Sequence, residues 1–79
     1  MDPRMIEMDL VQANANLQYA ENAYKQAKVF YDKGELTDSV FNRVCQLAVQ
    51  ADMALCEAMV IASKNGYKAD QIERVIANA

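Results

Sequence analysis

The chain has 79 residues, a length that fits one small domain. Apolar residues make up 53% of it, with only two glycines and one proline, which argues against disorder and against a β-sandwich. The net charge of −3 arises from 11 acidic and 8 scattered basic residues, so the clustered basic patch that nucleic acid binding needs is absent from the sequence.

The first predicted helix covers residues 3–32. Asp2 is a good N-cap, Pro3 fits the first helical position, and Met1 is placed to form a hydrophobic staple with Ile6. The apolar positions then alternate spacings of four and three residues, the heptad pattern of a helix that packs along another helix. These seam positions are Ile6, Leu10, Ala13, Leu17, Ala20, Tyr24, Ala27 and Tyr31.

Residues 33–37 are predicted to form a tight turn. Gly34 is expected to adopt the left-handed conformation that ends the first helix, and Thr37 is expected to cap the second. Leu36 and Phe41 have the spacing of a hydrophobic staple. Because so short a connection forces the two helices to run antiparallel, the sequence predicts a helical hairpin.

The second predicted helix, residues 38–64, carries two apolar stripes. The first matches the seam of the first helix, and consists of Phe41, Val44, Ala48, Ala51, Leu55, Ala58 and Ala62. The second consists of Cys45, Val49, Met53, Cys56 and Val60. One neighbouring helix cannot cover both, so we expect the second stripe to be available for another contact. We also expect Phe30, beside the first seam, to pack in the core at the turn.

A short third helix is predicted for residues 70–78. Asn65 and Gly66 end the second helix, and Asp70 with Glu73 has the spacing of a capping box. A helix this short is not stable alone. We therefore expect it to fold back, with the help of Tyr67, over the Val60 end of the second stripe. The fold class predicted for residues 1–79 is thus all-α: an antiparallel coiled-coil hairpin of two long helices plus a short C-terminal helix.

The residue types argue against catalysis. The chain has no histidine, no Cys-x-x-Cys motif and no glycine-rich phosphate loop, so we predict no enzyme, no catalytic residue, no metal site and no cofactor. Cys45 and Cys56 lie about three helical turns apart and cannot form an intrahelical disulfide. We expect them to be small buried hydrophobic residues, with an intermolecular disulfide or a redox role as the alternative.

The apolar runs of the sequence are all shorter than a membrane span of roughly 18–20 residues, and the N-terminus lacks the apolar core of a signal peptide. We therefore expect a cytoplasmic protein that does not insert into a membrane.

One segment resembles a known family. The stretch "FNRVCQLAVQADMALCEAMVIA" begins with the aromatic Phe41, ends in a run that includes Ala58, Val60 and Ile61, and follows a glycine-containing turn. It resembles the second helix of the small helical-hairpin co-chaperones of type III secretion needle subunits. The resemblance implies a cytoplasmic hairpin that binds a partner through an apolar face.

We expect the chain to be a small protein-binding module, for example a chaperone or adaptor, that binds a partner helix or a second copy of itself. Two alternatives are a phage- or mobile-element-encoded inhibitor that blocks a host protein complex, and a structural subunit of a homo-oligomer. The predicted partner interface combines the second stripe with exposed apolar residues of the first helix. It consists of Val49, Met53, Cys56, Val60, Tyr19, Met5 and Met8.

Overall fold

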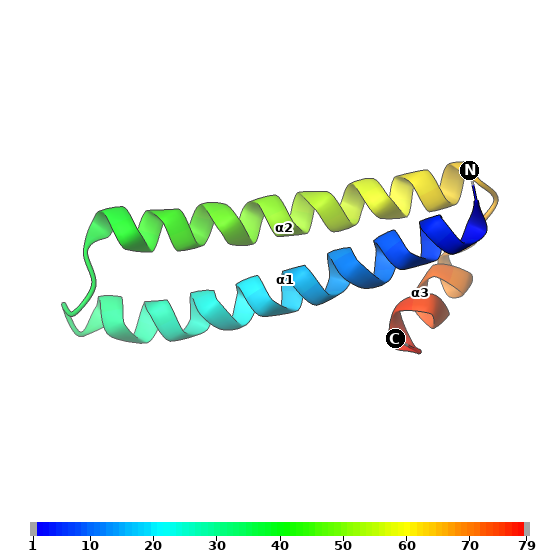
Figure 1. Cartoon of the computed structure of the whole chain (residues 1–79). Coiled ribbons are helices and arrows are strands. Elements are labelled where there is room, and N and C mark those ends of the chain that lie inside the picture. Colours follow the sequence, from blue (N-terminus) through cyan, green and yellow to red (C-terminus); the bar gives the residue numbers. More distant parts are fainter. Residues whose placement is uncertain (1, 79) are drawn as a thin grey trace.

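The computed structural model describes residues 2–78, and within that range the protein consists of three α-helices and no strand (Figure 1). Helix α1 spans Pro3–Asp32, α2 spans Asp38–Lys64 and α3 spans Ala69–Ala77. The first two run antiparallel and pack along their length, while α3 folds back beside the start of α1 (Figure 1). The predicted fold class is confirmed.

The starts of the two long helices agree with the capping residues of the sequence. The Asp2 carboxylate accepts a hydrogen bond from the backbone N–H of Arg4 at 2.9 Å, and Pro3 occupies the first helical position. The Thr37 hydroxyl accepts one from the N–H of Val40 at 3.3 Å. The staple expected from Met1 lies outside the described residues.

Both long helices end in a Schellman motif built on a glycine. Gly34 and Gly66 have φ angles of 76° and 93°, the left-handed region that costs a glycine little. After α1, the N–H of Glu35 donates to the Phe30 carbonyl at 2.9 Å. After α2, the N–H of Tyr67 donates to the Ala62 carbonyl at 3.0 Å. Each glycine therefore closes its helix and turns the chain sharply back.

The seam between α1 and α2 is the predicted one, since every predicted seam position is buried or half-buried. At the turn, the rings of Tyr31 and Phe41 stack with centroids 4.2 Å apart, and the Tyr31 hydroxyl donates to Asp38 at 2.6 Å. The expectation for Phe30 is wrong. Its side chain is about half exposed, because the two stacked rings already fill the end of the seam.

The core lies at the opposite end, where all three helices meet. Its buried residues are Ile6, Leu10, Ala62 and Ile72. Tyr67 packs against this cluster, and its hydroxyl donates to the Glu7 carboxylate at 2.8 Å. The expected packing of the third helix over Val60 is therefore wrong. Helix α3 contacts α1 more than α2, and Val60 stays 51% exposed.

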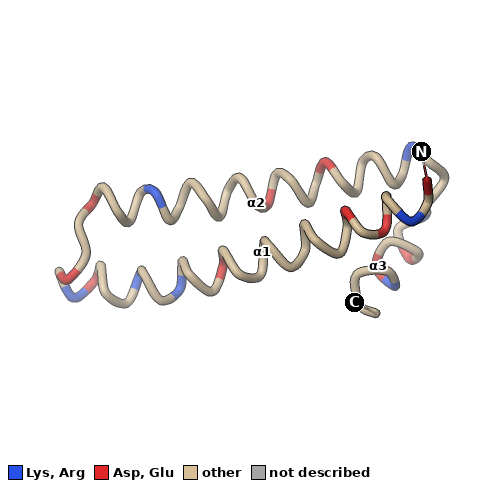
Figure 2. The backbone as a smooth tube through the Cα atoms, in the orientation of Figure 1, with Lys and Arg blue, Asp and Glu red and all other residues tan. Residues whose placement is uncertain are grey.

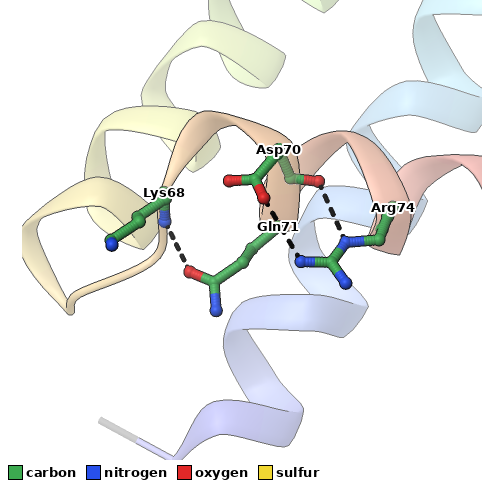
Figure 3. Close-up of polar contacts among 4 residues, drawn as sticks. All are labelled: Lys68, Asp70, Gln71 and Arg74. Carbon is green, nitrogen blue, oxygen red and sulfur yellow. Dashed lines mark hydrogen bonds and ion pairs between the residues drawn. The ribbon is translucent and has the colours of Figure 1, made fainter.

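The start of α3 also differs from the prediction, because Lys68 rather than Asp70 is the N-cap residue (Figure 3). The side-chain oxygen of Gln71 accepts a hydrogen bond from the Lys68 N–H at 2.7 Å. Asp70 instead lies within the first turn and forms an ion pair with Arg74 at 3.4 Å. Gln71 thus satisfies the backbone N–H of the N-cap residue Lys68, as Glu73 would have done for Asp70 in the expected box, two residues later.

The molecule is elongated, with principal extents of 47 × 20 × 17 Å. Its radius of gyration is 15.3 Å, against about 11.6 Å for a compact domain of this length. Its accessible surface is 5854 Å², whereas a compact monomer of 8.8 kDa exposes about 4,800 Å². Roughly 1,000 Å² of surface is therefore exposed in excess of what a compact protein of this mass would show.

Candidate binding surfaces

The first candidate surface is a row of side chains along the outer side of α2. We call Val49, Met53, Cys56 and Val60 the α2 stripe. Met53 is 57% exposed, and the other three side chains are exposed as well. The exposure arises because α1 covers only the seam of α2 and α3 packs on α1. The sequence expectation that Cys56 is buried is therefore wrong, whereas Cys45 is half-buried.

The charges around the α2 stripe have one sign. Asp52 and Glu57 lie on either side of it, about 40° around the helix from its edges. The sequence of α2 contains no lysine or arginine between Arg43 and Lys64, and Figure 2 shows that only acidic positions interrupt the middle of this helix. The stripe is thus an apolar row with acidic borders.

The second candidate surface is a groove between α1 and α2, with a volume of about 320 Å³. Three alanines, Ala20, Ala23 and Ala51, form its floor, and the side chains of Tyr19 and Leu47 rise beside it. Tyr19 is 80% exposed and Leu47 is 52% exposed. We call this the alanine groove; its lining is completed by Asn16 and Val44.

The alanine groove belongs to a longer apolar face. Residues seven apart share one side of a helix in such a hairpin. On α2 the row through Leu47 is Val40, Leu47, Ala54 and Ile61, and on α1 the row through Ala23 is Asn16, Ala23 and Phe30. All four large apolar side chains of these rows are exposed. We call the alanine groove together with these two rows the groove face; it points about 120° around α2 from Met53.

The third candidate surface is a hollow of about 750 Å³ between α1 and α3. Its lining mixes apolar side chains with polar ones such as Glu7 and Arg74. Met8 is part of it and is 65% exposed, and Met5 is half exposed in the same part of α1. At its edge the Tyr67 hydroxyl donates to Glu7, and this hydrogen bond raises the pKa of the Tyr67 phenol above its ordinary value.

The structure does not unite the predicted interface residues on one surface. The four members of the α2 stripe lie together, but Tyr19 lies beside the alanine groove and Met8 lies in the hollow beside α3. Sequence reasoning missed Leu47, Val40 and Ile61 as surface residues. Their seven-residue spacing was visible, but the alanine floor that makes the surface concave comes from both helices.

Helix α2 is also long and apolar enough, by length and composition, to cross a membrane. One window of 18 residues has a mean hydropathy of 1.5, and only 6% of that window is buried. In the sequence, each uninterrupted apolar run is short because glutamines, Asp52 and Glu57 divide the helix.

Within residues 2–78, no three cysteine, aspartate or glutamate side chains gather where they could hold a metal ion. No family model, no curated protein and no solved structure matches the chain.

Proposed function

We propose that this protein is a non-enzymatic binding module that holds an amphipathic helix of a partner protein along the α2 stripe. The observation that carries the proposal is the exposure of Val49, Met53, Cys56 and Val60, which neither α1 nor α3 covers. A row of apolar side chains at helical spacing is the surface into which the apolar face of another helix packs. A co-chaperone, the role implied by the sequence resemblance, is one case of this function.

The acidic borders of the α2 stripe define the chemistry of the partner helix. Asp52 and Glu57 favour lysine or arginine beside the partner's apolar row, and they disfavour a partner with acidic borders. Complementary border charges mainly select the partner and speed its association, while the apolar row supplies the affinity.

A membrane is the other class of apolar partner to consider, and the charges argue against it. Amphipathic helices that lie on membranes carry basic residues beside their apolar face, because cellular membrane surfaces are negative. Here the apolar stripe has acidic borders, and α1, which is paired with α2 along its length, has a polar outer side.

The test is photo-crosslinking in cells that produce the protein, with a crosslinking amino acid at Met53. The matched control places it at Gln18, an exposed position on the polar side of α1. We expect Met53 to capture a protein through an amphipathic helix with basic borders, identified by mass spectrometry of the joined peptides. Capture of lipid alone, of a second copy alone, or of the same proteins from both positions would contradict the proposal.

The quantitative test uses the captured helix as a labelled synthetic peptide. We expect Met53→Asp to weaken its binding at least about tenfold, because a charge then enters the apolar row. Leu47→Asp, an equally exposed position on the groove face, should leave the affinity unchanged. Equal affinities for the protein and its Met53→Asp variant would show that the helix binds elsewhere.

A further inference from the structure

We propose that the groove face binds the groove face of a second copy of this chain, with the two α2 helices antiparallel and crossing at Gln50. The product is a four-helix bundle in which each hairpin closes the alanine groove of the other. This inference goes beyond the partner proposed for the α2 stripe, because it concerns the groove face and does not need that partner; the two surfaces meet at Glu57, which borders the stripe.

The area of the molecule fits such a dimer. The chain exposes roughly 1,000 Å² more than a compact monomer of its mass. A specific interface of standard size removes about 800 Å² from each partner. Packing two groove faces together therefore brings the exposed surface per chain close to that of a compact protein.

The shape of the groove face is complementary to itself, as a two-fold symmetric interface requires. One molecule offers both a hollow floored by Ala20, Ala23 and Ala51 and the protruding side chains of Tyr19 and Leu47. A volume of about 320 Å³ accommodates side chains of this size. Tyrosine is also favoured at interfaces, because it offers a large apolar body and a hydroxyl at its tip.

The register of α2 selects the antiparallel arrangement. Arg43 and Glu57 each lie seven residues from Gln50, on the same side of the helix. In an antiparallel pair that crosses at Gln50, Arg43 of each copy lies opposite Glu57 of the other, so two ion pairs form.

The apolar residues of the groove face fit this arrangement to within one residue. Leu47 lies about 1.5 Å along the axis from the level of the small Ala54 of the second copy, and Val40 lies equally close to the level of its Ile61. In a parallel dimer, by contrast, the two turns lie at the same end, and Arg43 of one copy would lie about 21 Å along the axis from Glu57 of the other. The charges would then contribute nothing.

The first experiment measures the mass in solution by light scattering and sedimentation, at concentrations up to roughly 100 μM, where a micromolar interface is populated. We expect twice the mass of one chain. Leu47→Glu should give a monomer with unchanged helix content by circular dichroism, whereas Met53→Glu, equally exposed on the α2 stripe, should remain dimeric. A monomeric wild type, or a dimer that Met53→Glu breaks and Leu47→Glu does not, overturns the proposal.

The second experiment tests the register by reversing charges. Arg43→Glu and Glu57→Arg should each weaken the dimer about tenfold, because two ion pairs become two repulsions, and the double variant should restore it. Failure of the double variant to restore the dimer overturns the antiparallel register.

The third experiment remains decisive even if a charged variant fails to fold. In a Cys45→Ser, Cys56→Ser background, Gln50→Cys should form a disulfide between copies under mild oxidation, because the crossing brings the two positions within disulfide distance. Met53→Cys in the same background is the control and should not. Cross-linking at Met53→Cys alone, or at neither position, overturns the crossing at Gln50.

Discussion

At the scale of single residues, Tyr67 links the end of one helix to the start of another. Its N–H closes the Schellman motif of α2, its ring packs on the core cluster, and its hydroxyl reaches Glu7 on α1. The carboxylate raises the pKa of the phenol because the hydrogen bond requires the protonated hydroxyl. An alkaline pH is therefore expected to weaken the docking of α3 through Tyr67.

The pKa of Tyr67 determines the sign of this pH effect. The folded state favours the neutral phenol, so its contribution to stability is complete below the ordinary value of 10.0 and is lost as the pH rises through the raised value. We expect Tyr67→Phe to lower the melting temperature at neutral pH, and the difference from the wild type to vanish in strongly alkaline solution. Thermal unfolding followed by circular dichroism at several pH values measures both.

Glu7→Gln is the control for the pH effect. It keeps an oxygen acceptor for the hydroxyl but removes the charge, so the pKa of the phenol should be raised less. The loss of stability should then be smaller, and complete at a lower pH, than in the wild type. A difference between the wild type and Tyr67→Phe that is the same at all pH values would contradict this account of the hydrogen bond.

At the scale of elements, the two long helices and the turn could be predicted from the sequence, and the packing of the third helix could not. Asp2, Gly34 and Thr37 each have one local geometry that suits them, so the boundaries of α1 and α2 follow from them. The heptad seams determine which sides of these helices meet. The place of α3 depends instead on the direction in which the chain leaves Gly66, a property of three-dimensional geometry that spacing does not contain.

The docking of α3 rests mainly on Ile72, which is buried among α1 and α2 residues. Removing a buried isoleucine side chain to the β-carbon costs about 2–5 kcal/mol. A helix of nine residues has few other contacts to offset that loss, and it is not stable alone. We expect Ile72→Ala to release α3 while the hairpin stays folded, with hydrogen exchange of residues 69–77 becoming fast.

Glu73→Ala, on the exposed side of α3, is the control and should leave that exchange slow. If the amides of α3 are as protected in Ile72→Ala as in the wild type, the core cluster is not what holds this helix.

At the scale of the whole molecule, the candidate surfaces differ in how well they can be predicted from the sequence. The α2 stripe follows from periodicity along one helix. The groove face requires the lateral alignment of two helices, because Ala20 and Ala23 of one and Ala51 of the other make a floor only when they lie side by side. The hollow beside α3, in which Met8 lies, depends on a packing direction that the sequence leaves open.

If two copies form the bundle, association stabilises the folded chain. Each tenfold increase in protein concentration then adds about 1.4 kcal/mol to the stability of the dimer. Over a roughly hundredfold range, we expect the melting temperature to rise by about 5–10 °C. Calorimetry at several concentrations measures it. Leu47→Glu should melt at one temperature throughout, and a wild type that does the same would contradict coupled association.

The contact between Tyr67 and Glu7 joins residues 60 positions apart in the chain. A ribosome adds about 5–20 residues per second, so Tyr67 is synthesised roughly 3–12 seconds after Glu7. The part of the seam near the turn can close during that interval, but Ile6 and Leu10 have no α3 to cover them until Ile72 has been made. During synthesis, the apolar side chains at the start of α1 are therefore exposed to other apolar surfaces until α3 has been made. The rate of synthesis sets the length of this stage.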